Sequence, residues 1–347
     1  MSAKRPVALG VTAVPHTATL VRYNGPSLII RNRYSIRKGR FMSARFRIGV
    51  DLGGTKIEGA AVDVSGSVQV RQRIPTPVQD YHATIDAIIA LIGSIEQEIG
   101  ARASVGIGIP GAASPRTGLI KNANSTWLIG RPLQRDIETA LGRPIRLAND
   151  ANCFALSEAA DGAGAGMENV FGVILGTGVG GGIAIAGRIL AGANAIAGEW
   201  GHNPLPWPSP DEVPGPPCYC GRSGCIESFL SGPGLAADHY RQSGKCLGAP
   251  EIAEGAGRGD PECRATLARY TDRLARGLAS VINLVDPDAI VLGGGLSHIS
   301  ALYEQIPQLW RRYIFSDNVI TRLLPPVHGD SSGVRGAAWL WRPEEAP

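Results

Sequence analysis

One short stretch of the sequence contains four side chains that could bind a metal ion. They are His202, Cys218, Cys220 and Cys225. One histidine and three cysteines match the number and type of ligands that a tetrahedral structural zinc ion takes. The alternative is one disulfide with a thiol left over. Cysteines two residues apart do not bridge easily, however, and three cysteines this close together in an apparently intracellular chain favour a metal.

Two glutamates flank the four potential ligands. Glu199 lies in Gly-Glu-Trp-Gly-His just before them, and Glu227 follows the last cysteine. Gly221 and Gly224 allow the backbone to turn tightly around an ion, and folding the loop brings the two carboxylates towards one place. Paired surface acids are otherwise usually only solvated. Because a zinc ion with four protein ligands has no open position for chemistry, we expect a small zinc-bound loop that braces a binding site.

Two glycine-rich turns follow predicted strands and could contact phosphate. The first joins strands expected at 46–50 and 58–62 and reads Asp51-Leu52-Gly53-Gly54-Thr55-Lys56. Its main-chain N–H groups and its threonine hydroxyl could donate to an anion, although Gly-Gly turns also occur in hairpins without function. The second follows a strand at 171–175 and reads Gly176-Thr177-Gly178. It begins a G-x-G-x-x-G pattern, but a dinucleotide fold needs a helix next, and 183–191 predicts another hairpin.

A third glycine run and an aspartate also follow strands. Gly293-Gly294-Gly295 comes after a strand at 289–292 and would let a flat ring approach the main chain. Asp150 lies between a strand at 145–148 and a helix at 153–160. It could be the N-cap of that helix, or it could point into the crevice beyond the strand, where ligands of α/β sheets bind.

A polar loop at 121–128 contains Asn124 and ends in an aromatic residue, Trp127. Amide and hydroxyl groups beside an indole suit a sugar, and a turn anchored by a core tryptophan is the alternative. Helices are predicted at 81–99, from 260 to 286 and at 333–341 from their apolar spacing and caps.

Charge is distributed unevenly along the 347 residues. Residues 1–47 contain ten of the 34 Lys and Arg residues and none of the 30 Asp and Glu residues, which leaves the rest with 24 basic against 30 acidic residues, a net charge of −6. Nucleic-acid binding by the body of the protein is therefore not indicated. Residues 1–46 form a basic extension, either disordered or upstream of a true start at Met42, with a transit peptide as the alternative. Residues 170–187 lack charge but contain seven glycines, so a buried strand and loop is predicted there rather than a membrane span.

These stretches together resemble the ROK family of sugar kinases, a branch of the actin-like ATPases. The motifs G-E-W-G-H and C-x-C-G-x-x-G-C-x-E are highly specific to that family, and the resemblance runs from about Arg47 to Trp341. The segments K-N-A-N-S-T-W-L and G-E-W-G-H-N-P-L-P-W look most like those of bacterial fructokinases that also accept mannose. C-F-A-L-S-E-A and G-T-G-V-G-G-G are similar in style to N-acetylglucosamine kinases.

The resemblance implies a two-domain α/β fold of the actin-like ATPase (ribonuclease H-like) type with an interdomain cleft. A small domain would comprise 47–148 plus 329–343, and a large domain 149–328. It implies ATP bound by the three glycine turns and Mg²⁺ near Asp51. The cofactor-binding residues expected are Asp51, Gly53, Gly54, Thr55, Lys56, Gly176, Thr177, Gly178, Gly293, Gly294 and Gly295.

The resemblance also implies the sugar contacts and the reaction. Asp150 would be the catalytic base, and the substrate-binding residues would be Asn124, Asn149, Asp150, Glu199, His202 and Glu227. The predicted reaction is phosphorylation of D-fructose at its C6 hydroxyl. The alternatives are a kinase for N-acetylglucosamine, glucose or mannose and, remotely, a sugar-sensing repressor. We expect a cytoplasmic homodimer with no nucleic-acid or membrane partner.

Overall fold

The computed structural model describes residues 46–342 and residue 345. The predicted basic extension therefore lies outside the described residues, apart from Phe46. The division into domains at 47–148, 149–328 and 329–343 remains a prediction.

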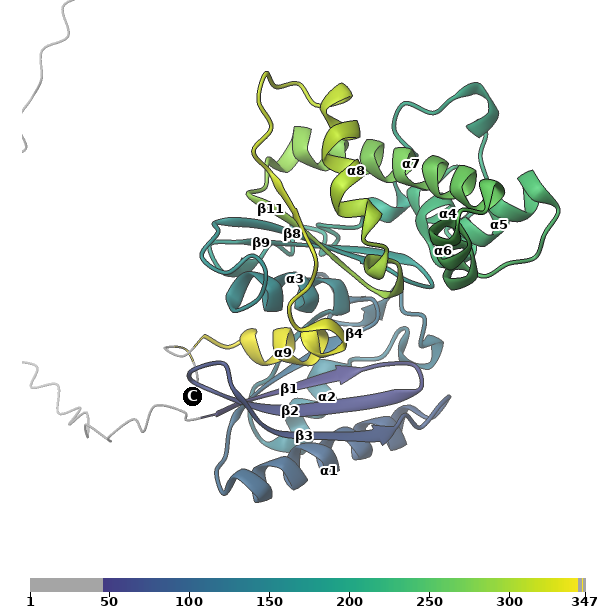
Figure 1. Cartoon of the computed structure of the whole chain (residues 1–347). Coiled ribbons are helices and arrows are strands. Elements are labelled where there is room, and N and C mark those ends of the chain that lie inside the picture. Colours follow the sequence, from purple (N-terminus) through teal and green to yellow (C-terminus); the bar gives the residue numbers. More distant parts are fainter. Residues whose placement is uncertain (1–45, 343–344, 346–347) are drawn as a thin grey trace, which may run out of the picture. The chain divides into compact units, whose positions relative to one another are not determined.

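Five strands form the first sheet, in the order β3-β2-β1-β4-β7 (Figure 1). The strands are β1 (Phe46–Leu52), β2 (Lys56–Asp63), β3 (Val68–Pro75), β4 (Ser104–Ile109) and β7 (Arg146–Asn149). β1, β2 and β3 are antiparallel neighbours, whereas β4 runs parallel to β1 and β7 parallel to β4. The strands predicted from apolar runs are thus confirmed, and β3 was not predicted. A separate small ribbon contains β5 (Ala112–Ala113) and β6 (Ile120–Lys121).

Two helices pack on the outer face of this sheet. They are α1 (Tyr81–Ile99) and α2 (Leu133–Leu141). α1 begins because the Asp80 side chain accepts a hydrogen bond from the Ala83 N–H, and it ends at Gly100, whose φ of 65° is left-handed. Its isoleucine face is buried against the strands, as the 3–4 spacing predicts.

The second sheet repeats the arrangement of the first, in the order β10-β9-β8-β11-β12. Its strands are β8 (Asn169–Leu175), β9 (Val179–Ile185), β10 (Arg188–Ile189), β11 (Ala289–Gly293) and β12 (Arg322–Leu324). β8, β9 and β10 are antiparallel, and β11 and β12 run parallel to β8. Because β9 follows Gly178 directly, the glycine pattern after β8 is not followed by a helix, and the dinucleotide fold is excluded.

Five helices form a layer on the outer side of the second sheet. They are α4 (Ile226–Leu230), α5 (Gly232–Ser243), α6 (Ala249–Arg258), α7 (Pro261–Val285) and α8 (Ala301–Leu309). In this layer α5 and α6 pack against α7 rather than on the strands. Short 3-10 turns occur at Thr126–Leu128, Trp200–His202, Pro210–Glu212, Gly295–His298, Trp310–Arg312 and Gly329–Ser331. α7 begins at the predicted N-cap, where Asp260 accepts from the Cys263 N–H, and it ends at Asp286. In the part of the chain that the structure describes, no helix is long and apolar enough to cross a membrane.

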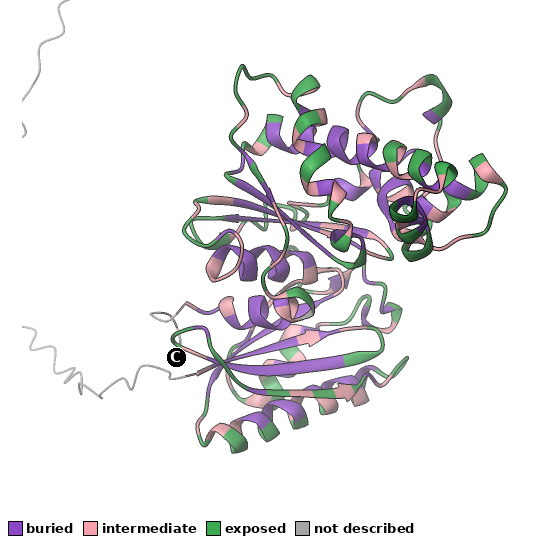
Figure 2. Ribbon diagram, in the orientation of Figure 1, coloured by how far each residue is buried: buried purple, intermediate pink, exposed green. Residues whose placement is uncertain are grey.

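Two helices lie between the sheets: α3 (Asp150–Ala160) and α9 (Ser332–Trp339) (Figure 1). α3 contacts β8 and β9, α9 contacts β1 and β4, and the two helices contact each other. α3 is almost wholly buried, as Figure 2 shows. Glycines permit this close packing, since a Cβ at Gly336 of α9 would lie 1.7 Å from the main-chain oxygen of Cys153. The carboxyl end of β7, which continues into α3, therefore lies at the seam between the two halves.

Candidate active site

Asp150 is the first residue of α3 and directly follows β7, at the seam between the two halves. Asn149 has extended backbone angles, and its Oδ1 accepts hydrogen bonds from the main-chain N–H groups of Ala151 (2.9 Å) and Asn152 (3.4 Å). The N-cap is therefore Asn149, and the alternative prediction that Asp150 caps the helix is wrong. Burial raises the pKa of Asp150, and the N–H of Ala151, 2.8 Å from its Oδ1, opposes that rise.

The predicted substrate-binding residues surround one polar cavity of about 590 Å³, which we call the sugar-side cavity. They are Asn124, Asn149, Asp150, Glu199, His202 and Glu227. The first three come from the first half of the chain and the start of α3, and the others from the loop after β10 and from α4. These residues, far apart in sequence, meet here because β7 of the first sheet continues directly into α3, which packs on the second sheet.

Glu227 is held in place by the turn between β8 and β9. Its Oε2 accepts a hydrogen bond from the main-chain N–H of Val179 at 2.9 Å. A Cβ at Gly178 would lie 2.7 Å from the same oxygen, so a side chain at that position of the turn would push the carboxylate of Glu227 aside. The glycine turn predicted for phosphate thus also fixes a carboxylate of the sugar-side cavity.

The four predicted metal ligands form a cluster. The ligand atoms of His202, Cys218, Cys220 and Cys225 all lie within 4.8 Å of one another. Cys220 Sγ is 3.6 Å from Cys225 Sγ, far longer than a disulfide of about 2.05 Å, and Cys218 Sγ is 3.6 Å from His202 Nδ1. Gly221 and Gly224 have φ values of 87° and 71°, as the expected tight turn requires. The donor set and its spacing fit a tetrahedral ion.

A buried ion-pair network anchors the proline-rich loop that precedes these cysteines. Glu212, which is buried, pairs with Arg273 at 2.7 Å and with Arg276 at 2.8 Å, both on α7. Burial raises the pKa of Glu212, but the hydrogen bonds from Arg276 and Arg273 outweigh it and lower that pKa to about 2. The loop that carries the metal-binding cluster is therefore fixed to the helical layer.

A second cavity, of about 890 Å³, adjoins the first and contains two of the glycine turns; we call it the phosphate-side cavity. Its lining includes Asp51, Gly53, Gly54, Thr55, Asp150, Gly293, Gly294 and Gly295. Lys56, which was predicted to bind the cofactor, does not line this cavity; it is the exposed first residue of β2. Asp150 and Asn124 line both cavities, so the aspartate stands at their junction. Burial, and next the negative charge of Asp150, raise the pKa of Asp51 to about 6.

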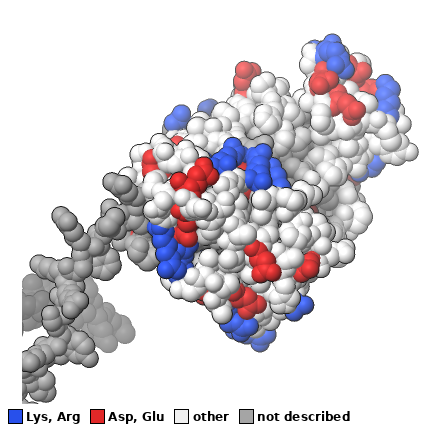
Figure 3. Space-filling view, turned by 90° about the horizontal axis from the view of Figure 1, so that it is seen from below, with Lys and Arg blue, Asp and Glu red and all other residues white. Residues whose placement is uncertain are grey.

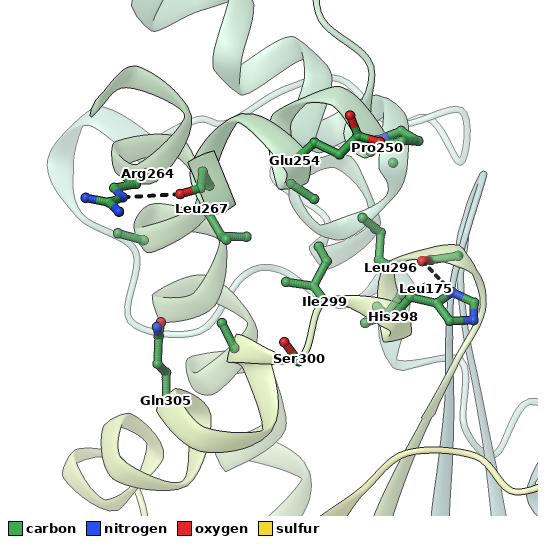
Figure 4. Close-up of a pocket in the computed structure, with 18 of the residues that line it drawn as sticks. Leu175, Pro250, Glu254, Arg264, Leu267, Leu296, His298, Ile299, Ser300 and Gln305 are labelled. Carbon is green, nitrogen blue, oxygen red and sulfur yellow. Dashed lines mark hydrogen bonds between the residues drawn. The ribbon is translucent and has the colours of Figure 1, made fainter. Parts of the chain in front are cut away.

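A third cavity, of about 910 Å³, was not predicted from the sequence (Figure 4). Its walls are mainly apolar and come from Leu175, Ala249, Pro250, Leu267, Leu296 and Ile299. It shares Gly295 and His298 with the phosphate-side cavity. At its edge, the Nε of Arg264 donates to the main-chain oxygen of Ala256 at 3.2 Å. A flat apolar ring in this cavity would lie close to the third glycine turn.

The family model described as ROK matches residues 47–344. The chain belongs to the ROK family. Two relatives, the N-acetyl-D-glucosamine kinases of Salmonella paratyphi C (strain RKS4594) and Escherichia coli (strain K12 / DH10B), are each 41% identical over 296 residues, which is 84% of this chain and 98% of theirs.

Solved ROK structures share the fold. The ROK hexokinase of Thermus thermophilus is 32% identical with a TM-score of 0.76, covering 85% of this chain and 97% of its own. A ROK glucokinase from Streptomyces griseus, solved with glucose and AMPPNP, is 30% identical with a TM-score of 0.67, covering 84% and 98%. A ROK transcriptional regulator at 23% identity and a TM-score of 0.74 shows the fold alone. Two sheets with the same strand order agree with the predicted actin-like ATPase fold. The fructose prediction finds no support among these relatives.

Trp127 does not take part in the sugar-side cavity of this ROK protein. Its indole N–H donates to Thr84 Oγ1 on α1 at 3.3 Å, and the residue lines the phosphate-side cavity. Trp127 therefore anchors its turn, whereas Asn124 of the same loop lines the sugar-side cavity. Sequence reasoning also missed Tyr219 and Arg222, which lie inside the cysteine motif and line the sugar-side cavity. The only feature of the sequence that could have indicated these two residues is their position between the predicted metal ligands Cys218 and Cys225.

Proposed function

We propose that this protein is an ATP-dependent hexose kinase that transfers the γ-phosphoryl group to the C6 hydroxyl of N-acetylglucosamine. The observation that carries the proposal is the place of Asp150 at the junction of a carboxylate-lined polar cavity and a glycine-lined one. A sugar hydroxyl and a terminal phosphate brought from opposite sides would meet at this carboxylate.

The choice of sugar follows the relatives named N-acetyl-D-glucosamine kinase, at 41% identity. Glucose and mannose are the alternative substrates, and fructose is no longer proposed as the substrate. The two glutamates suit any hexose, because a carboxylate accepts hydrogen bonds from ring hydroxyls without reading which carbon bears them.

Asp150 would hydrogen-bond the C6 hydroxyl and accept its proton as the oxygen approaches the γ-phosphorus. Burial raises its pKa, which makes the carboxylate a better proton acceptor than a solvated aspartate. Phosphoryl transfer passes through a loose transition state, so alignment of the two substrates supplies most of the acceleration. Glu199 and Glu227 would hold the ring in that alignment.

ATP would lie with its phosphates along the turns at Gly53-Gly54 and Gly293–Gly295 and its adenine in the apolar cavity of Figure 4. Asp51 is the residue we assign to the Mg²⁺ that accompanies the nucleotide. Burial, and then the negative charges of Asp150 and Glu58, raise the pKa of Asp51, so a cation bound there would offset the cost of keeping this carboxylate ionised. Mg²⁺ supplies neutralisation of phosphate charge when bound.

His202, Cys218, Cys220 and Cys225 are the residues that would hold zinc. Because all four positions are taken by protein, the ion would brace the loop between Glu199 and Glu227 rather than act on a substrate. Homodimerisation also remains part of the proposal, and light scattering after gel filtration would test it.

A second class of function, DNA binding, gains no support. The body of the chain is net negative, and on the face shown in Figure 3 basic and acidic side chains are interspersed rather than gathered into a basic stripe.

The deciding experiment is steady-state phosphorylation of N-acetylglucosamine, glucose, mannose and fructose with coupled detection of ADP. We expect N-acetylglucosamine to give the highest kcat/KM. In the same assay Asp150→Asn should retain sugar binding and lose about 10²-fold or more in kcat. Near-normal turnover of that variant would remove Asp150 from its role, and no turnover with any of the four sugars would overturn the proposed function.

A further inference from the structure

Tyr219 lies between two cysteines of the metal-binding cluster and faces the sugar-side cavity. The residue is 77% exposed and lines the cavity together with Glu199 and Glu227. Within the part of the chain that the structure describes, its hydroxyl makes one hydrogen bond, of 3.0 Å, to Nε2 of His202. A phenol so exposed is held by that contact and by the edge of the imidazole ring, not by core packing.

The two nitrogens of His202 face different groups. Nδ1 lies 3.6 Å from Cys218 Sγ and therefore faces the metal-binding cluster. Nε2 faces Tyr219, with the two rings perpendicular (87°) and their centroids 5.1 Å apart. If a metal takes the lone pair of Nδ1, Nε2 carries the proton and can only donate. The phenol oxygen of Tyr219 then accepts the hydrogen bond that His202 has to offer on the cavity side.

The Tyr219 hydroxyl lies on the cavity side of His202, in a cavity that Glu199 and Glu227 also line. A phenol is protonated at neutral pH, so this hydroxyl can both accept and donate a hydrogen bond. A neutral hydroxyl that accepts from an imidazole and lies near two carboxylates offers the same pattern as a hydroxyl of a hexose. In the structure, the hydrogen-bonding position on His202 Nε2 is thus already filled by a side chain of the protein.

We propose that Tyr219 sets the affinity of the site for sugar: its hydroxyl occupies the position on His202 Nε2 that a hexose hydroxyl takes, and binding of the hexose displaces it. The inference rests on the proposed function. Displacement breaks one hydrogen bond and no packing contact of the core, so the ring can leave while the cluster around it stays in place. Sugar binding therefore competes with a contact inside the protein and is weaker than the cavity alone would permit.

The test is Tyr219→Phe, which keeps the ring and removes the competing hydroxyl. One hydrogen bond between neutral groups corresponds to a factor of about two to ten in affinity. We expect the Kd for N-acetylglucosamine, measured by calorimetry without ATP, to fall by about that factor, and KM to fall with it. Tyr240→Phe is the matched control, since Tyr240 on α5 is 55% exposed and lines none of the three cavities.

Each outcome decides the question. Tighter sugar binding by Tyr219→Phe, with bound zinc equal to wild type, supports the inference. Unchanged or weaker binding overturns it, since the hydroxyl would then be idle or would itself contact the sugar. If the wild type neither binds nor phosphorylates N-acetylglucosamine, glucose, mannose or fructose, the proposed function has failed. If it phosphorylates one of them and the variant does not bind that sugar more tightly, only the role of Tyr219 has failed.

Discussion

Replacing Gly336 by alanine should push apart the two helices that lie between the sheets. A Cβ there would lie 1.7 Å from the main-chain oxygen and 2.4 Å from the main-chain carbon of Cys153. Carbon–oxygen contacts in proteins stay above roughly 3 Å, so α3 and α9 would have to separate by roughly 1.3 Å.

Neither helix can retreat into its own sheet. A Cβ at Gly182 of β9 would meet the Ala151 oxygen of α3 at 2.4 Å, and one at Gly106 of β4 would meet the Ala337 oxygen of α9 at 1.9 Å. The overlap must therefore open the sheets or strain the backbone. Overpacking of this kind costs about 3 kcal/mol, and at about 2–4 °C per kcal/mol the Tm should fall by about 6–12 °C.

Activity should fall further than stability. α3 begins with Asp150, and α9 begins beside Asp51, whose Oδ2 would be 3.0 Å from a Cβ on Gly333. A misplacement of about 1 Å can cost 10²-fold in turnover, so kcat of folded Gly336→Ala should drop by about that factor.

Differential scanning fluorimetry and steady-state kinetics would test the reasoning about Gly336. The control is Gly93→Ala in the middle of α1, where a Cβ meets no atom within 4 Å. It should raise stability by about 0.5–1 kcal/mol and leave kcat unchanged. A Gly336→Ala protein as stable and active as Gly93→Ala would refute the close helix contact.

Three further predictions concern charge and metal. Asp51→Asn should raise the Tm more at pH 7.5 than at pH 5 while abolishing turnover. The folded-state pKa of about 6 lies above the ordinary 3.8, so the ionised carboxylate destabilises the fold above pH 6, and this cost shrinks as the pH falls and the group protonates. An equal gain in Tm at both pH values would contradict the raised pKa. Cys225→Ser should lose bound zinc, measured by atomic emission, and lose activity through disorder of the sugar-side cavity; a zinc-free, fully active protein would show that the loop needs no ion. Arg276→Met should lower the free energy of unfolding by about 3 kcal/mol, because Glu212 loses one of its two buried arginine partners and keeps only Arg273. Arg258→Met, on the exposed pair with Glu254, should lower it by less than about 1 kcal/mol; similar effects of the two substitutions would mean that the Arg276 pair is not buried.

Local signals in the sequence were enough for the strands around the glycine turns and for α1 and α7. Their apolar spacing and caps act over a few residues, so no partner had to be known. β3 was missed because Val68–Pro75 is an edge strand in which polar residues interrupt the apolar ones and most side chains are exposed, and its Arg71 and Arg73 pair with Glu58 on β2. Such a strand depends on its neighbour rather than on its own apolar content.

The candidate site was predictable where chemistry shows in residue type. The cysteines, the paired glutamates and Asp150 meet as expected, whereas the cap of α3 could not be assigned because Asn149 and Asp150 are both good N-caps and only the backbone angles separate them. The apolar cavity could not be predicted from the sequence, because α6, α7 and Gly295–His298 contribute ordinary aliphatic residues that line a cavity only after the chain has folded.

The two halves of the chain exchange their last helices. α3 follows the last strand of the first sheet but packs on β8 and β9 of the second, and α9 follows β12 but packs on β1 and β4 of the first. A nascent polypeptide leaving the ribosome therefore holds β1 and β4 with one face uncovered until α9 has been synthesised. Emergence of α9, rather than completion of either half, should mark the moment at which the native state becomes accessible.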